Sequence, residues 1–217
     1  MMNAVAEAET SEWLDIFDDN FRLVGSKSRR AVHVDGNWHQ TFDCWIVRRV
    51  PEPAVLFQHR SLDKLDHPGL WDASIGGHIR TGETVLDGAR EAREELGLDL
   101  TADILVPLGL RTCTSRTPTR IDREFQHIFL AQLDLALDAF RLNPEEVSAL
   151  AWLGIEQGMD LVQGRARQAS MEIRRWSGEE QFDTMESSDL VPCKDRYYQR
   201  VFIAASRYLA GSCDLAI

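Results

Sequence analysis

The chain has 217 residues, of which 44% are hydrophobic and 27% charged, values typical of one soluble globular domain. Thirty-five acidic residues against 24 basic ones give a net charge of −11, which argues against a nucleic-acid polymer as partner because phosphate contacts need clustered Lys and Arg. No apolar run is long enough to span a membrane, the N-terminus lacks signal-peptide features, and no C-x-x-C occurs among the four cysteines. We therefore expect a cytoplasmic protein with reduced thiols.

The first elements are short. Residues 1–11 are small, acidic and aperiodic, which predicts a disordered terminus. Trp13 to Phe17 reads as a strand followed by a turn. The β-forming run 41–49 is interrupted by two prolines and resumes at 55–57, which predicts a hairpin.

The segment 61–83 is rich in glycine, proline and charged residues, which is typical of a functional loop. A helix is predicted from about Thr84 to Leu96, where Gly97 ends it. Its apolar residues lie at helical spacing and form one stripe, made of Val85, Ala89, Ala92 and Leu96.

The remaining chain mixes strands and helices. Residues 154–190 are expected to form helical pieces with loops at Gly164 and Gly178, and a last amphipathic helix covers about 195–209. Because there is no regular alternation of strand and helix, the predicted fold class is α+β. Three further strands are predicted, at 104–110, 125–133 and 149–153.

Three glutamates share one face of the predicted helix. Glu91, Glu94 and Glu95 point away from the apolar stripe at about 100° per residue. Clustered carboxylates on a rigid wall are the ligands that Mg²⁺ prefers. Taken alone, the helix also fits a solvated surface carrying an Arg90–Glu94 pair, since exposed charged faces are the rule in soluble helices.

The loop before this helix favours the metal-binding interpretation over the solvated helix face. Gly77 to Glu83, followed by Arg90 to Leu98, resembles the Nudix box, G-x5-E-x7-R-E-U-x-E-E-x-G-U, in which U is a bulky aliphatic residue. Two positions depart from it: six residues instead of seven separate Glu83 from Arg90, and the aliphatic position is Ala92.

The resemblance implies roles for the box residues. Glu91, Glu94 and Glu95 would bind Mg²⁺, with Mn²⁺ as the alternative ion, and Glu91 would also serve as base or water-orienting group. Glu83 and Arg90 would form a supporting ion pair. The shortened spacing puts the placement of Glu83 in question.

A wider resemblance covers roughly residues 12–153. The stretch from Gln58 to Asp72 is similar to Q-R-R-S-x-x-K-x-x-x-P-G-x-W-D, a pattern of the Nudix branch that includes isopentenyl-diphosphate isomerases and many hydrolases. In the isomerases a catalytic cysteine and a second glutamate would occupy the positions of Gly76 and Gln126. Because neither residue present here can act as acid or base, the chemistry of an isomerase is expected to be lost.

Other candidates come with plainer alternatives. Lys64 and Arg60 are candidate phosphate contacts, against a solvated lysine and a structural ion pair. Glu124 is a candidate substrate contact, metal ligand or base, against a strand-end glutamate. Residues His33, His39 and His78 approximately match a second metal site of the isomerases, which we rank below a structural role. Trp38 and Trp45 are expected in the core.

Together these features predict a Nudix α/β/α sandwich with a mixed sheet, spanning 12–217, with its core at about 40–153 and a helical C-terminal elaboration at about 154–210. The expected function is that of a Nudix pyrophosphohydrolase, which cleaves a diphosphate linkage in a nucleoside diphosphate derivative or related X-linked diphosphate. Gly77 is counted among the candidate substrate contacts. The alternatives are an isomerase-like enzyme and a non-catalytic ligand-binding Nudix module. The expected partner is a small molecule, and a homodimer is compatible with the sequence.

Overall fold

The computed structural model describes residues 11–217, so the predicted disordered terminus, apart from Ser11, lies outside the described residues. The elements begin with β1 (Trp13–Phe17), β2 (Leu23–Ser28), α2 (Arg29–Asp35), β3 (Trp38–Arg48), β4 (Ala54–Arg60), β5 (Trp71–Asp72), β6 (Ile75–His78), the 3₁₀ helix η1 (Val85–Ala89) and α3 (Arg90–Leu96). They continue with η2 (Ala102–Ile104), β7 (Val106–Arg116), β8 (Ile121–Gln132), η3 (Leu137–Ala139), β9 (Val147–Gly154), α4 (Ile155–Val162), β10 (Gln168–Arg175), β11 (Glu180–Glu186), η4 (Ser187–Asp189) and α5 (Tyr197–Leu209).

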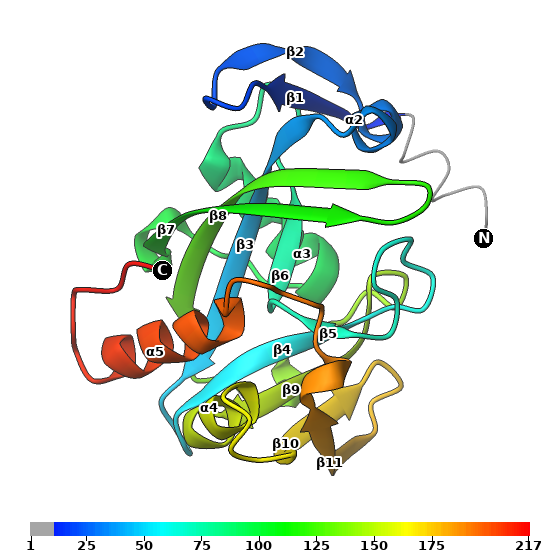
Figure 1. The fold of residues 1–217 in the computed structure, drawn as a ribbon. Helices are drawn as coiled ribbons and strands as arrows, with labels where there is room; N and C mark the ends of the chain where they lie inside the picture. Colours follow the sequence, from blue (N-terminus) through cyan, green and yellow to red (C-terminus); the bar gives the residue numbers. More distant parts are fainter. Residues whose placement is uncertain (1–10) are drawn as a thin grey trace.

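The strands form one mixed sheet (Figure 1). Its main order is β11-β10-β9-β4-β3-β1-β2, and β8 pairs with β3 in parallel while β7 pairs antiparallel with β8. The short strand β6 also pairs with β3, from Thr41↔His78 to Cys44↔Ile75. This register brings the glycine-rich strand β6 and the first half of β8 beside the same stretch of β3, one on each edge of that strand.

Strand β3 is buried on both faces because helices cover both sides of the sheet. Phe42, Cys44 and Ile46 belong to the core cluster that contains Ala92 and Leu96 of α3. The alternate residues of β3 belong instead to the cluster formed with α4 and α5. Successive side chains of a strand point to opposite faces, so this alternation produces the predicted α/β/α layering of the Nudix fold. Trp45 is fully buried and donates to the Tyr197 hydroxyl (Nε1 to Oη 2.8 Å).

The predicted strands and the hairpin of β3 with β4 are present, but the expectation of helical pieces at 154–190 is right only for α4. The segment 168–186 is instead an antiparallel hairpin of β10 and β11 that extends the sheet beyond β9. Ala169, Met171 and Ile173 are buried at a spacing of two, the period of a strand. Their neighbours Gln168, Ser170, Glu172 and Arg174 are polar, so this alternation was a signal for a strand that the sequence-based expectation missed.

Among the described residues, no helix is long and apolar enough to span a membrane. The four cysteines are all free thiols, and Cys44 alone among them is buried.

Candidate functional site

The predicted box helix is two helices end to end. Val85–Ala89 is a 3₁₀ helix, and the α-helix starts only at Arg90. Five residues of 3₁₀ helix turn through roughly 600° and rise about 10 Å, while six residues of α-helix turn through roughly 600° and rise about 9 Å. The tighter winding therefore compensates for the residue that the box lacks.

As a result, Glu83 and Arg90 meet. The Arg90 guanidinium donates to both carboxylate oxygens of Glu83, at 2.7 and 3.1 Å, and to the carbonyl oxygen of His78 at 2.8 Å. Glu83 also accepts from the backbone N–H of Arg80 at 2.8 Å. Arg90 thus ties the loop before the helix to strand β6, and the backbone N–H of Arg80 closes the loop on the same carboxylate.

Gly88 allows η1 to lie directly against the sheet. A Cβ at this position would sit 2.5 Å from Cβ of Phe42, which is fully buried. We expect Gly88→Ala to lower the free energy of unfolding by about 1–3 kcal/mol through overpacking. Leu86→Ala on the same turn, where the side chain is exposed, should change it far less. Urea unfolding of both variants measures the difference, and equal stabilities would contradict this account.

The three glutamates of α3 differ in exposure but line one cavity of about 2110 Å³. The side chain of Glu95 is buried, and it accepts from the backbone N–H of Gly76 at 3.3 Å. The side chain of Glu91 is 13% exposed and that of Glu94 is 45% exposed. Their shared face therefore lines the cavity, with Glu95 buried in it and Glu94 at its solvent-exposed side. Oxygen donors gathered in this way suit a hard divalent cation.

Gly77 makes room for Glu91. A Cβ built on Gly77 would lie 2.2 Å from the carboxyl carbon of Glu91, a distance at which no side chain fits. The Glu91 carboxylate also accepts from the Arg90 guanidinium. Strand β6 and Arg90 therefore hold this carboxylate between them at the floor of the cavity.

Burial raises the pKa of the Glu95 carboxyl to about 8, although Lys64 opposes the shift. Burial also raises the pKa of Asp43 to about 7, and the nearby Asp72 adds to that shift. Burial of His33, with His39 beside it, lowers the pKa of that imidazole to about 4. The carboxyls thus favour the protonated form in the folded protein, whereas the imidazole favours the neutral form.

These shifts predict how the stability of the metal-free protein changes with pH. Below pH 6.5 the unfolded state binds more protons at the imidazoles, so their contribution makes stability rise with pH. Between about pH 6.5 and 8 the folded state binds more protons at Glu95, so stability falls. We expect the melting temperature in EDTA to fall over this interval, by about 2–4 °C for each kcal/mol lost, and Mg²⁺ to restore it most at pH 8. A rise over the same interval would contradict the assignment.

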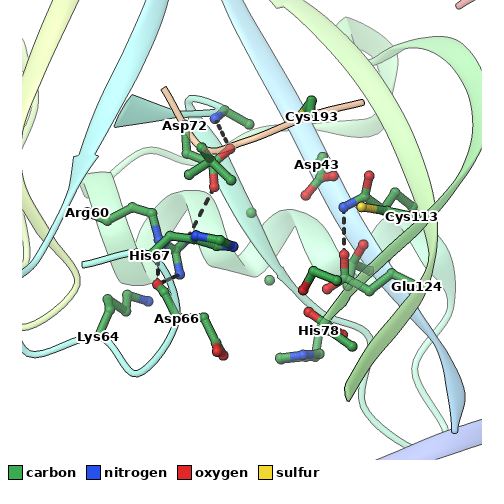
Figure 2. A pocket seen from close by; sticks show the side chains of 18 of the residues that line it. Asp43, Arg60, Lys64, Asp66, His67, Asp72, His78, Cys113, Glu124 and Cys193 are labelled. Atoms are coloured by element: carbon green, nitrogen blue, oxygen red, sulfur yellow. Dashed lines mark hydrogen bonds and ion pairs between the residues drawn. The ribbon is translucent and has the colours of Figure 1, made fainter. Parts of the chain in front are cut away.

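Two cationic side chains line the same cavity (Figure 2). Arg60 donates to the carbonyl oxygen of Asp66 at 2.8 and 3.0 Å and to the Asp72 carboxylate at 3.3 Å. Lys64 forms an ion pair with Glu146, and burial lowers its pKa. Both predicted phosphate contacts therefore face the cavity, each with a structural acidic partner.

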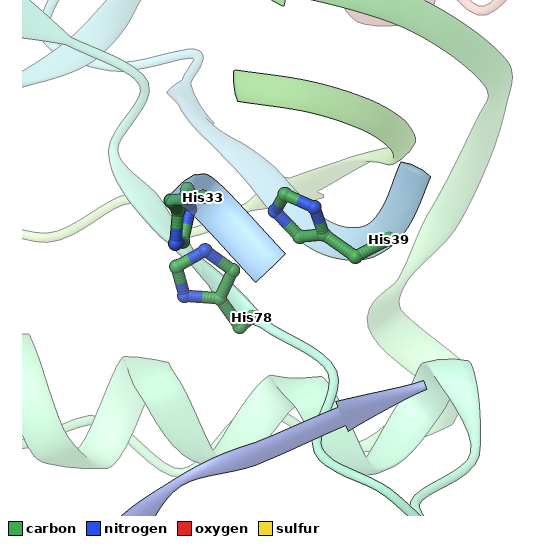
Figure 3. Close-up of side chains that lie close together, drawn as sticks. All are labelled: His33, His39 and His78. Carbon is green, nitrogen blue, oxygen red and sulfur yellow. The ribbon is translucent and has the colours of Figure 1, made fainter. Parts of the chain in front are cut away.

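The structure also brings together the three histidines that the sequence ranked low (Figure 3). The rings of His33, His39 and His78 have centroids 4.9–5.2 Å apart, and one nitrogen of each lies within 4.8 Å of the others. A second group of potential ligands, His39 with Asp122 and Glu124, adjoins them.

The hydrogen bonds of this imidazole cluster (His33, His39 and His78) suit metal binding. Nδ1 of His33 lies 2.8 Å from the carbonyl oxygen of Arg29, and Nδ1 of His39 lies 3.1 Å from that of Asn37. Because a carbonyl only accepts, each Nδ1 carries the proton and each Nε2 keeps its lone pair. Nε2 of His39 is buried without a hydrogen-bond partner. The buried, neutral imidazoles thus fit a borderline-soft divalent ion such as Zn²⁺, as well as Mn²⁺.

Glu124 is not a strand-end residue, since β8 starts at Ile121. Burial, together with Asp122 and Asp43, raises the pKa of its carboxyl well above the usual range. Its Oε2 accepts from Gln126 at 2.6 Å, and its Oε1 lies 4.0 Å from Nε2 of His39. Glu124 therefore joins the cavity to the imidazole cluster.

Asp43 was missed by the sequence-based reasoning, although an isolated acid in the apolar run of β3 is a detectable signal. It faces Gly76, the position that resembles the cysteine of the isomerases, and a Cβ there would lie 3.0 Å from Oδ1 of Asp43. Asp72, Arg111, Asp122 and Asp195 also line the cavity and were not anticipated.

Neither tryptophan lines the cavity. Trp45 lies in the core as predicted, whereas Trp38 is only partly buried and stacks on Phe125 with ring centroids 4.6 Å apart.

Solved structures show the same fold. The crystal structure of a Deinococcus radiodurans protein aligns with a TM-score of 0.51 and 23% identity, covering 70% of this chain and 90% of that chain.

Sequence comparisons give the family. An uncharacterized Nudix hydrolase of Clostridium acetobutylicum is 36% identical over 201 residues, which make up 89% of this chain and 96% of that protein. An isopentenyl-diphosphate Delta-isomerase of Cutibacterium acnes is 30% identical over 186 residues, covering 82% of this chain and 89% of that protein. The model of the NUDIX domain matches residues 37–176. The chain therefore belongs to the Nudix family and is an enzyme of its pyrophosphohydrolase type.

Proposed function

We propose that this enzyme hydrolyses a diphosphate linkage in a nucleoside diphosphate derivative or a related X-linked diphosphate. The observation that carries this proposal is the shared cavity, which is lined both by the carboxylates of Glu91, Glu94 and Glu95 and by the cations of Arg60 and Lys64. A diphosphate is the ligand class that needs both, since divalent cations bridge it to carboxylates while Arg and Lys contact its oxygens directly.

Glu91, Glu94 and Glu95 would hold the divalent ions, with Mg²⁺ first and Mn²⁺ as the alternative. When bound, these ions would polarise the phosphoryl oxygens, neutralise the developing charge and lower the pKa of water. Glu91 would also orient the attacking water or accept its proton, because its carboxylate lies against the floor of the cavity at Gly77. Glu83 would act through Arg90, which it holds in place.

Substrate binding would draw Lys64 and Arg60 toward phosphate oxygens. Lys64 faces Glu146 and Arg60 faces Asp72 in the free protein, so a bound phosphate would compete with these carboxylates. Gly77 would bring the backbone of β6 close to the diphosphate, and Glu124 would lie at the far side of the cavity from the two cations (Figure 2).

Isomerisation is the second candidate, because the imidazole cluster and Glu124 sit at the positions that resemble the isomerases' second metal site. Three features disfavour it. Gly76 has no side chain, Gln126 cannot transfer a proton as a carboxylic acid does, and the region between them is polar. An isopentenyl chain would have to lie against Asp43 and Glu124.

A substrate panel distinguishes the two functions. The purified protein is incubated with Mg²⁺ and nucleoside diphosphates, nucleoside triphosphates, sugar nucleotides or isopentenyl diphosphate, and products are separated by chromatography. We expect Mg²⁺-dependent cleavage of at least one diphosphate linkage and none in EDTA. Formation of dimethylallyl diphosphate from isopentenyl diphosphate would favour the isomerase, and absence of any cleavage across the panel would refute the hydrolase.

A further inference from the structure

The chain between β11 and α5 forms part of the cavity wall. Its start is fastened to strand β5, because the N–H of Val191 donates to the carbonyl oxygen of Trp71 at 2.9 Å. Its end is fastened by Tyr197, the first residue of α5, which is buried and accepts from Trp45. Cys193 and Asp195 between these points line the cavity. A segment held at both ends in this way can orient what it touches.

Asp195 binds Arg111 through two hydrogen bonds. The guanidinium Nε and Nη2 donate to the two carboxylate oxygens at 2.8 and 3.0 Å, the bidentate geometry that fixes an arginine most firmly. The Arg111 side chain is 8% exposed, and its guanidinium carbon lies 4.0 Å from the centroid of the Tyr197 ring. The Arg111 guanidinium is thus held by two groups, the Asp195 carboxylate before α5 and the Tyr197 ring at the start of α5.

Arg111 in turn fixes the orientation of the Gln126 side-chain amide. Its remaining terminal nitrogen donates to the side-chain oxygen of Gln126, which leaves the amide nitrogen of Gln126 facing the opposite way. That nitrogen donates to Oε2 of Glu124 at 2.6 Å. An amide can accept from an arginine through its oxygen and donate to a carboxylate through its nitrogen at once. Oε1 of Glu124 is consequently the oxygen turned toward His39.

We propose that Asp195 is a positioning residue of the active site, which through Arg111 and Gln126 holds Glu124 with one oxygen turned toward the imidazole cluster. The C-terminal segment is therefore part of the catalytic apparatus rather than an appendage to it. The role of Glu124 in the reaction rests on the proposed function, but the hydrogen-bonded chain and its effect on a cation at the imidazole cluster do not.

Cation binding tests this proposal without a substrate. Co²⁺ is titrated into the full-length protein in excess Mg²⁺, and visible absorption reports coordination by the imidazoles. Because groups that orient a ligand typically contribute 10- to 100-fold to metal affinity, we expect Asp195→Asn and Gln126→Leu each to weaken Co²⁺ binding by about tenfold or more. Since both act on the same carboxylate, the double variant should bind no more weakly than the weaker single variant.

Arg200→Ala is the matched control, because Arg200 also pairs with Asp195 but lies on α5 with its side chain 40% exposed and does not line the cavity. It should bind Co²⁺ within about twofold of the wild type. Thermal unfolding of every variant checks the fold, and Asp195→Glu, which keeps the charge but lengthens the side chain, replaces Asp195→Asn if that variant unfolds.

Three outcomes would overturn the proposal: no Co²⁺ spectrum for the wild type, unchanged affinity in Asp195→Asn, or effects of the two single variants that multiply in the double variant. Failure of the proposed function looks different. In that case no diphosphate is cleaved, yet the Co²⁺ affinities follow the expected order.

Discussion

Glu95→Gln and Glu94→Gln are each expected to lower kcat for Mg²⁺-dependent diphosphate cleavage by at least about a thousandfold, which corresponds to about 4 kcal/mol of transition-state stabilisation. The amide keeps the shape of the side chain but removes the negative charge that would hold the divalent ion, and metal ions supply several kcal/mol to such reactions. Initial-rate measurements over a range of Mg²⁺ concentrations give kcat and the Mg²⁺ dependence of each variant.

The same variants show whether a loss of activity comes from lost catalysis or from unfolding of the protein. Glu95 is buried and burial raises the pKa of its carboxyl, so the neutral amide should leave the metal-free protein at least as stable as the wild type above pH 7. Glu156→Gln, at an exposed position of α4, is the control and should keep wild-type activity. If Glu95→Gln retains more than about a tenth of the wild-type kcat, the assignment of this carboxylate is wrong.

Gly77→Ala should abolish activity nearly as completely as Glu91→Gln does. A Cβ at position 77 would overlap the carboxyl group of Glu91 at 2.2 Å, so the side chain must leave its place between strand β6 and Arg90. Because both substitutions remove the same carboxylate from the floor of the cavity, the double variant should be no less active than the less active single variant. This non-additivity is measured as kcat/KM of the three variants.

The neighbouring glycine provides the comparison. At Gly76 a Cβ would lie 3.0 Å from a carboxylate oxygen of Asp43, the end of a side chain that can rotate away. Gly76→Ala should therefore reduce kcat/KM much less than Gly77→Ala. Equal losses in the two alanine variants would mean that the backbone of β6, rather than the room it leaves for Glu91, is what activity requires.

The elements that could be predicted from the sequence are those with a strong local period. The apolar stripe of Ala92 and Leu96 lies in the core as expected, and the same helix period places Glu91, Glu94 and Glu95 together on the opposite face. By contrast, the hairpin of β10 and β11 was not anticipated. In β11 the polar and apolar positions do not alternate clearly, since Phe182 on this strand is 83% exposed, although β10 does alternate.

The one-residue deletion in the box shows where local reasoning reaches its limit. The sequence places the gap between Glu83 and Arg90 and raises doubt about their contact. In the structure the chain winds into a 3₁₀ helix there, with Gly88 packed against Phe42. This tighter winding brings Arg90 into contact with Glu83.

Local sequence was sufficient for the family, the layered fold and the carboxylate wall, because each depends on residues within a few turns or strand positions of one another. The imidazole cluster and the chain from Asp195 to Glu124 were decided by tertiary structure. Arg111 and Asp195 are 84 positions apart in the chain, and they meet only because the parallel pairing of β3 with β8 and the seating of α5 on the sheet bring them to one end of it. Contacts between such distant residues depend on strand register and helix packing, which leave no spacing pattern in the sequence. The net charge of −11 likewise said nothing of the cations of Arg60 and Lys64, which folding gathers into the same cavity as the glutamates.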